Sequence, residues 1–218
     1  MIVAIVGTVG SGKSLSTVRT ILKRNTTCFT NFNVKHDKII RLLKDHIVTE
    51  NIKGYKKNGD AIKEKLINWD FWNTTIKKHK GFDICLDEVH NVIHSRLSMS
   101  KHNVLMTIWF SQIRKMLGVS EKNNIYLVTQ KFNRIDVAFR DLLDVIILCK
   151  KEKKGKKVFI HQYYFYGENC LDNYYLYKTN PSLARKQRLY RHTFFLGNPY
   201  FKYYDSYELI KFGETAYV

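Results

Sequence analysis

Short, continuously apolar segments alternate along the first 150 residues with longer stretches whose apolar positions recur at helical spacing. These segments are rich in β-branched and aromatic residues and predict strands at 2–6, 27–31, 82–88, 125–129 and 145–149, the third of which ends in two acidic residues. Helical spacing is found instead at 15–23, 105–117 and 137–143. Strands that are apolar at every position are typical of a parallel sheet covered by helices on both faces. We therefore expect an α/β fold with a mostly parallel sheet.

The interval at residues 35–80 differs from its surroundings because it is polar and very basic. Its lysines stand at 35, 38, 44, 53, 56, 57, 63, 65, 77, 78 and 80. The segment Lys56-Lys57-Asn58-Gly59-Asp60 predicts a tight turn, and 39–43 and 62–67 are predicted to be short amphipathic helices. We expect this interval to be a lid or an insertion between core strands.

The composition changes again after residue 150. The charge run at 150–157 predicts an exposed hairpin turn before a strand at 158–166, and tyrosine and phenylalanine then become frequent. These aromatic side chains are expected to lie in the core or at a subunit contact. The length of 218 residues suits one domain. We expect residues 1–150 to form its core, with the basic insertion at about 35–80, and residues 151–218 to form a strand hairpin and a small aromatic-rich extension.

A phosphate-binding loop, Gly-x4-Gly-Lys-Ser, follows the first predicted strand directly. Glycines let successive backbone N–H groups turn toward phosphate oxygens, the lysine reaches the β- and γ-phosphates, and the serine hydroxyl is a ligand for Mg²⁺. The alternative is a glycine-rich turn that binds nothing, which the strand before, the helix after and the complete Gly-Lys-Ser ending oppose. The residues predicted to bind ATP are Gly7, Thr8, Val9, Gly10, Ser11, Gly12, Lys13 and Ser14.

Two acidic residues, Asp87 and Glu88, stand at the carboxyl end of the strand predicted at 82–88. A hydrolytic P-loop enzyme needs a carboxylate that holds Mg²⁺ beside the phosphates and a base that polarises the attacking water. Asp87, together with Ser14, fits the role of metal ligand, and Glu88 fits the role of the base. An Asp-Glu pair is common by itself, and the phosphate-binding loop upstream is what favours the catalytic interpretation. A nucleotide kinase is less expected to carry the adjacent glutamate.

Gln130 closes the strand predicted at 125–129, and the carboxyl ends of strands line the ligand crevice of a doubly wound sheet. Its amide can sense the γ-phosphate or orient the attacking water, and an ordinary polar strand end is the alternative. Arg134 and Arg140 lie just beyond, and either can act as an arginine finger in a neighbouring subunit's site. Arg96 and Arg114 are weaker candidates, because most arginines on helices are solvated or paired.

The formal net charge is +18. So large an excess of positive charge indicates a polyanionic partner, either nucleic acid or an anionic membrane face. The alternative explanations of the charge are a source whose proteins are generally basic, or a need for solubility. The lysine-rich interval and the charge run at 150–157 could track a phosphate backbone. Trp69, Phe71 and Trp72 are expected to be core residues rather than base-stacking ones.

The remaining polar and sulfur-containing residues exclude several classes of site and compartment. The four cysteines show no metal-like pairing, and the expected absence of disulfides fits a reducing cytosol. His90 and His94 lack both the glutamate of a zincin and an evident third ligand, so we expect them to be structural. The N-terminus does not resemble a signal peptide, and no apolar run approaches the ~20 residues that cross a bilayer. We expect a cytoplasmic location, which for a viral protein is the host cytoplasm, with association with the virion also open.

The order of these motifs resembles the zonular occludens toxin-like (Zot-like) ATPases of the HerA/FtsK superfamily, which includes viral genome-packaging ATPases. The resemblance covers roughly residues 1–150. It rests on the N-terminal phosphate-binding loop, Thr30-Asn31, Leu86-Asp87-Glu88-Val89-His90, and Thr129-Gln130 followed by Arg140. The segment Tyr203-Tyr204-Asp205-Ser206-Tyr207-Glu208 is similar to a late element of some members.

This resemblance implies a RecA-like P-loop domain with an additional strand, often assembled as a hexameric homo-oligomeric ring. It implies that Lys13 and Ser14 bind ATP and Mg²⁺ and that Asp87 holds the metal. It also implies that Glu88 is the catalytic base, Gln130 the sensor and Arg140 the finger. Filamentous-phage members carry a transmembrane segment after the ATPase domain, and this sequence shows none, which favours a packaging motor over membrane export.

The leading hypothesis is therefore an ATP-driven translocase of double-stranded DNA that packages a viral genome. One rival is an assembly or secretion ATPase that acts on protein, with capsid or membrane assembly proteins as partners. Another is a basic nucleic-acid-binding protein that uses ATP only as a structural ligand. A nucleotide kinase is a more distant alternative, because the lysine-rich interval offers no clear nucleoside-binding lid.

Overall fold

The computed structural model describes residues 1–24, 26–79, 81–89, 100–117 and 123–204. Within these residues, one eight-stranded sheet has the order β10-β9-β8-β1-β7-β6-β2-β3, and β4 and β5 form a separate two-stranded sheet. The strands of the large sheet are β1 (Ile2–Val6), β2 (Thr27–Thr30), β3 (Ile39–Arg41), β6 (Phe82–Leu86), β7 (Ile125–Thr129), β8 (Val145–Lys154), β9 (Lys157–Tyr166) and β10 (Arg191–Leu196).

The six strands from β8 to β3 pair in parallel, whereas β9 and β10 join the β8 edge as antiparallel neighbours. Every residue of β1, β6 and β7 is buried, which explains why their sequences are apolar except at Asp83 and Thr129. The predicted mostly parallel sheet is thus confirmed. The segment after residue 150 extends that sheet at one edge.

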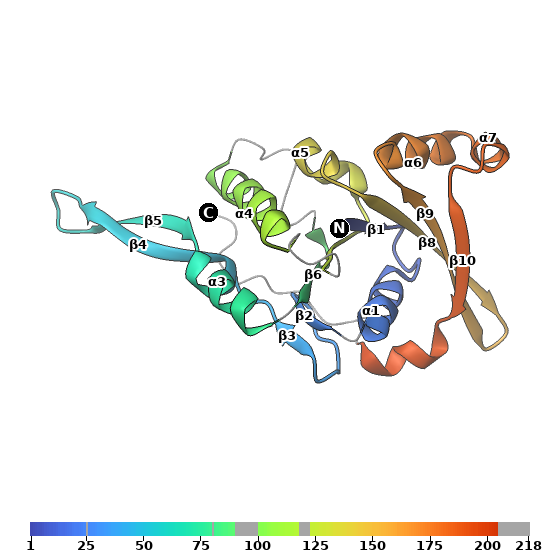
Figure 1. Ribbon diagram of the computed structural model, residues 1–218, viewed down its shortest axis with the longest axis horizontal. Coiled ribbons are helices and arrows are strands. Elements are labelled where there is room, and N and C mark those ends of the chain that lie inside the picture. Colours follow the sequence, from blue (N-terminus) through green and yellow to red (C-terminus); the bar gives the residue numbers. More distant parts are fainter. Residues whose placement is uncertain (25, 80, 90–99, 118–122, 205–218) are drawn as a thin grey trace.

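Helices cover both faces of the sheet, as predicted (Figure 1). On one face, α1 (Lys13–Arg24) and the 3₁₀ segment η4 (Asn198–Tyr203) contact an apolar cluster that includes Val3 and Ile5 of β1. The other apolar cluster, around Ile2 and Ala4 of the same strand, includes residues of the opposite helices. These helices are α3 (Trp69–Lys78), α4 (Lys101–Leu117), α5 (Val137–Arg140) and α6 (Cys170–Thr179).

The core on this second face is strongly aromatic. Trp72 of α3 and Trp109 of α4 are fully buried, and their ring centroids lie 5.5 Å apart. Trp69 and Phe71 pack against the same cluster. The expectation that these α3 residues belong to the core is confirmed, so a base-stacking role for Trp72 is excluded.

Two short helices predicted in the basic interval are wrong. Residues 39–41 form β3, which pairs in parallel with β2, and residues 61–67 form β5 (Ala61–Ile67), which pairs with β4 (Val48–Tyr55). The apolar positions of such short segments fit a helix and a strand about equally, and pairing with a partner strand decides between them. The interval contains only the one-turn helix α2 (Lys44–Ile47) before α3.

The β4–β5 hairpin projects away from the sheet and its helices, at the left of Figure 1. Its turn occupies the predicted tight turn at 56–60, where Lys56 N–H donates to the Asp60 carbonyl at 2.8 Å. Ile52 and Tyr55 are more than half exposed on it. Residues 48–67 of the basic interval therefore form a protruding β-ribbon, whereas β3 belongs to the large sheet and α3 packs into the core.

Other boundaries differ from the predictions by several residues. The predicted turn at 150–157 is mostly strand, because β8 continues to Lys154 and β9 begins at Lys157. The helix α5 ends at Arg140 instead of residue 143, and α4 begins at Lys101 within a predicted loop. The helix predicted at 90–94, most of the loop at 95–103, and the helix end at Gly118 fall outside the described residues. Among the residues described, no helix is long and apolar enough to cross a membrane.

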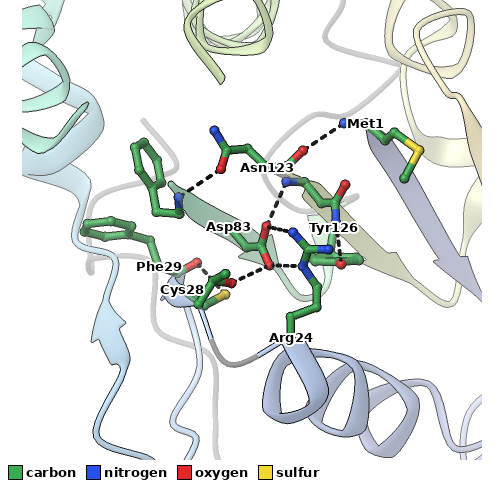
Figure 2. Close-up of polar contacts among 10 residues, drawn as sticks. Met1, Arg24, Cys28, Phe29, Asp83, Asn123 and Tyr126 are labelled. Carbon is green, nitrogen blue, oxygen red and sulfur yellow. Dashed lines mark hydrogen bonds and ion pairs between the residues drawn. The ribbon is translucent and has the colours of Figure 1, made fainter. Parts of the chain in front are cut away.

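A buried ion pair ties the end of α1 to the amino-terminal edge of the sheet. Figure 2 shows the Arg24 guanidinium directed at Asp83 of β6, with Nε 2.5 Å from Oδ2 and Nη2 3.2 Å from Oδ1. The Asp83 carboxylate also accepts a hydrogen bond from the backbone N–H of Asn124, at 2.8 Å, just before β7. This contact holds α1 in register with β6 and β7, whose opposite ends carry the candidate site.

Candidate active site

The phosphate-binding loop connects β1, which ends at Val6, to α1, which begins at Lys13. Gly12 has φ +87°, and a Cβ atom placed there would collide with the Ile160 side chain of β9. A Cβ at Gly7 would collide with Ser11 and with the carbonyl oxygen of Cys149. Glycine is thus required at both positions, because β8 and β9 pack directly against the loop.

Lys13 lies at the start of α1 and is almost entirely buried. Its ammonium donates a hydrogen bond to the carbonyl oxygen of Thr8 at 2.9 Å, across the mouth of the loop. Burial lowers the pKa of Lys13, while the nearby Glu88 and Asp87 carboxylates oppose this shift. The loop therefore holds a desolvated cation at the helix N-terminus, where anions are favoured.

Asp87 and Glu88 follow β6 and lie beside this loop. Ser14 Oγ donates a hydrogen bond to Asp87 Oδ2 at 3.4 Å, although 73 residues separate them. Burial raises the pKa of Asp87 to about 6, and the Glu88 carboxylate adds to the rise. The two converging oxygens of Ser14 and Asp87 are the hard ligands that Mg²⁺ prefers, so this pair fits the predicted metal.

Glu88 adopts a left-handed backbone conformation, with φ +50°, which is uncommon for a residue other than glycine. Burial raises the pKa of Glu88, while Lys13 and the side chain of Gln130, which lies beside the carboxylate, lower it. Strained residues of this kind cluster at functional sites. The strain turns Glu88 out of the strand direction at the point where β6 ends.

The sheet order explains why Gln130 meets Glu88. Strand β7 lies between β1 and β6 and runs parallel to both. The carboxyl ends of the three strands are therefore adjacent, so that the phosphate-binding loop, Gln130 and the Asp87-Glu88 pair lie along one edge of the sheet. This is the additional-strand arrangement that the sequence resemblance implied.

Asn31 was singled out only by the resemblance, and the structure shows its contact. Its Nδ2 donates to the carbonyl of Asp87 at 2.9 Å, and its Oδ1 accepts from the Asp87 N–H at 2.7 Å. Asn31 itself is almost fully buried after β2. The side chain thus replaces the strand partner that β6 loses at Asp87, and the position of a polar residue directly after a buried strand is the sequence signal for it.

A cavity of about 1010 Å³ opens beside the phosphate-binding loop. Its walls include residues 6–11 of the loop, residues 130–134 after β7, residues 148–151 of β8, and part of α6. Lys131 and Lys151 line it, and neither was a predicted site residue. The Lys151 ammonium lies 4.0 Å from the position of a Cβ at Gly10. The cavity can accommodate a polyanionic ligand next to the loop.

The two candidate fingers occupy different surroundings. Arg134 is exposed and lines this cavity, at the end of the 3₁₀ turn η3 (Phe132–Arg134). Arg140 is half-buried, and its Nη1 donates to the hydroxyl of Tyr175 on α6 at 3.0 Å. Arg140 is thus held within its own chain. The side chains of Arg96 and Arg114, like His90 and His94, fall outside the part of the chain that the structure describes.

Comparison with known proteins gives one family and several solved structures. The family model described as zonular occludens toxin (Zot) matches residues 1–208. The chain is similar to the N-terminal domain of zonular occludens toxin from Neisseria meningitidis, at 17% identity over 94% of this chain and 98% of that chain, with a TM-score of 0.50. No curated protein matches the sequence.

The chain is also similar to B204, described as the DNA-packaging ATPase from Sulfolobus Turreted Icosahedral Virus, at 14% identity over 91% of this chain and 93% of that chain, with a TM-score of 0.44. A structure of the genome packaging NTPase B204 from Sulfolobus turreted icosahedral virus 2 in complex with ATP-gammaS matches at 13% identity over the same shares, with a TM-score of 0.40.

Proposed function

The chain belongs to the zonular occludens toxin (Zot) family, and we propose that it is a Mg²⁺-dependent ATPase that translocates double-stranded DNA during viral genome packaging. The observation that supports hydrolysis best is the meeting of four side chains at the sheet edge. Ser14 contacts Asp87, and Gln130 contacts Glu88, although each pair joins distant parts of the sequence. A loop that only binds nucleotide needs no base and no orienting amide.

Each of these groups has a role in the proposed reaction. The loop N–H groups and Lys13 would bind the phosphates, while Ser14 and Asp87 would hold Mg²⁺, which would supply positive charge beside them. Glu88 accepts a proton from the attacking water, and Gln130, which lies beside Glu88, orients that water. Arg134 lies at the cavity and is the better placed of the two candidate fingers for completing a neighbouring subunit's site in a ring.

Charge supports DNA as the substrate. The net charge is +18, and the exposed β4–β5 hairpin carries five lysines against three acidic residues. Two of those acids, Glu50 and Glu64, lie 3.5 Å from lysines of the same hairpin. A two-stranded ribbon fits the major groove of a duplex, and its lysines reach the phosphates without reading sequence. The proposed location is the host cytoplasm.

The test is steady-state ATP hydrolysis at low salt with and without double-stranded DNA. We expect DNA to stimulate turnover, and we expect Lys13→Ala and Glu88→Gln to abolish it, with Glu88→Gln still binding ATP. Lys23→Ala is the matched control, because Lys23 is exposed at the other end of α1. Turnover indifferent to DNA but raised by capsid or membrane assembly proteins would support a protein-assembly ATPase instead. Nucleotide binding without turnover in the unaltered protein would support a basic nucleic-acid-binding protein.

A further inference from the structure

The antiparallel edge of the sheet carries a row of aromatic side chains on one face. Strand register places His192 of β10 opposite Tyr163 of β9, and Phe194 opposite His161. Directly paired residues point to the same face of a sheet, and alternation adds Phe159. The name aromatic face is used below for Phe159, His161, Tyr163, His192 and Phe194.

The opposite side of these strands is already covered. Ile160 packs with Leu15 of α1, and Gln162 donates a hydrogen bond to Ser16 of α1 at 2.6 Å. Phe195 is buried on this side, beneath the guanidinium of Arg19. Helix α1 therefore packs on one side of these strands, and the aromatic face lies on their opposite side.

Three rings of the aromatic face form a stack, and its two β10 rings are exposed, whereas its three β9 rings are half-buried. His192 stacks on Tyr163, with centroids 4.7 Å apart, and on His161, with an interplanar angle of 7°. Phe194 is 63% exposed, and His192 is also exposed. Exposed rings held in a row are costly in water unless a partner covers them.

Cations surround the aromatic face. At one end of the face is a hollow of about 430 Å³. It is lined by Tyr163, His192, Tyr190, Arg185 and Arg188. The two arginines are exposed at and just after the end of α7 (Pro181–Lys186), beside β10 (Figure 1). In the described part of the chain, neither guanidinium has an ion-pair partner.

Two lysines of β8 complete this charged border. The Lys150 ammonium lies 5.2 Å from the Tyr163 ring centroid, and that of Lys154 lies 6.0 Å from the Phe159 ring centroid. Glu152 also points to this side, but its carboxylate already contacts Lys154 at 3.1 Å and His161 at 2.9 Å. The face is therefore an aromatic surface with a cationic border.

We propose that the aromatic face binds single-stranded nucleic acid, with bases stacked on its rings and phosphates bound by Arg185 and Arg188. Stacking platforms bordered by cations bind single strands with little sequence preference, because every base has a π-face. The bases of a duplex are already stacked on one another, so a duplex would use only the cations. Lys150 also lines the cavity beside the phosphate-binding loop, but none of the five rings does, and binding here requires no ATP.

The test is fluorescence anisotropy of a labelled oligo(dT) strand, without nucleotide, over a range of salt concentrations. We expect Phe194→Ala and His192→Ala each to weaken binding about tenfold, which is the lower part of the usual effect of one stacked ring. Phe194→Tyr should restore binding, because tyrosine keeps a ring. Phe201→Ala is the control, since Phe201 is an exposed ring on η4.

The arginines should act differently from the rings. Arg185→Ala and Arg188→Ala should each lower the slope of log affinity against log salt by about 0.7, whereas the ring variants leave the slope unchanged. Circular dichroism of each variant checks the fold. The proposal is overturned if the ring variants bind oligo(dT) normally, if a duplex of equal length binds equally well and with the same sensitivity to Phe194→Ala, or if Phe194→Ala converts an oligomer into a monomer without affecting oligo(dT).

Discussion

Asn31 and Asp87 are joined by two hydrogen bonds between one side chain and one backbone unit, at 2.9 Å and 2.7 Å. The two residues stand at the ends of adjacent strands, β2 and β6, and both are buried. The asparagine side chain therefore fixes the backbone of Asp87 and, with it, the position of the acidic pair. It has no charge with which to bind nucleotide phosphates. It is a positioning residue in the proposed mechanism.

Asn31→Ala should reduce ATP turnover much more than ATP binding. The variant leaves the buried N–H and carbonyl of Asp87 without these partners, so unfolding free energy should fall by about 1–3 kcal/mol. Turnover should fall at least tenfold, because a small displacement of the catalytic groups is costly. Asn33→Ala, at an exposed position nearby, is the control. Lost stability with unchanged turnover would show that the contact is only structural.

The β4–β5 hairpin should supply part of the salt dependence of duplex binding. Replacing Lys56 and Lys57 at its turn together with alanine should lower the slope of log affinity against log salt by about 1.8, if both lysines neutralise phosphates. The matched control is Lys77→Ala with Lys78→Ala, since these two lysines are exposed on α3. Equal slopes for both double variants would exclude the hairpin from the duplex contact.

The Arg24–Asp83 pair should matter far more to stability than a surface pair. Asp83→Ala leaves a half-buried guanidinium and the N–H of Asn124 without their acceptor, and should lower the unfolding free energy by about 3 kcal/mol. Glu64→Ala removes an exposed ion pair with Lys53 and should change the unfolding free energy by less than about 0.5 kcal/mol. Urea unfolding measures both. Similar losses from the two variants would contradict this ranking.

Gly12→Ala should fail for two separable reasons, a strained backbone and a collision with Ile160. The strain costs about 1–2 kcal/mol and the collision about 1–3 kcal/mol. Gly59 in the hairpin turn has a similar φ of +85° with no atom near its absent Cβ, so Gly59→Ala measures the strain alone. Ile160→Ala added to Gly12→Ala should relieve the crowding, and no relief would show that the loop cannot be repacked in this way.

Stability should decline as the pH falls below about 6.5, in part because of His46. This imidazole stacks on Phe71 at 4.2 Å, and its Nδ1 accepts a hydrogen bond from the Leu43 N–H. Burial lowers the pKa of His46 below its ordinary value of 6.5, against the effect of Asp45. The unfolded chain therefore takes up the proton first as the pH falls, and stability present above pH 6.5 is lost below it.

His46→Asn keeps an acceptor for Leu43 but does not titrate, so the stability difference between pH 7.5 and pH 5 should be smaller in this variant than in the unaltered protein. Urea unfolding at the two pH values measures it. An unchanged difference would assign the decline to other groups.

Local pattern was sufficient for the central strands and the phosphate-binding loop. Strands β1, β6 and β7 are buried on both faces, which favours apolar residues at successive positions, and this pattern, broken only at Asp83 and Thr129, can be read directly from the sequence. The loop needs its glycines, lysine and serine within eight consecutive residues. Asp87, Glu88 and Gln130 could be assigned because each lies within two residues of the end of such a strand. Their catalytic roles remain predictions.

Contacts between distant residues were decided only by the tertiary structure. The strands β3 and β5 are short, and their apolar positions became informative only when β2 and β4 were known as partners. Three contacts at the site were likewise visible only in the tertiary structure. They are the hydrogen bonds from Asn31 to Asp87, the hydrogen bond from Arg140 to Tyr175, and the packing of Ile160 against Gly12. The physical reason is that local periodicity specifies which side of an element is buried, whereas the identity of its neighbour depends on strand order and register, which no short segment of sequence encodes.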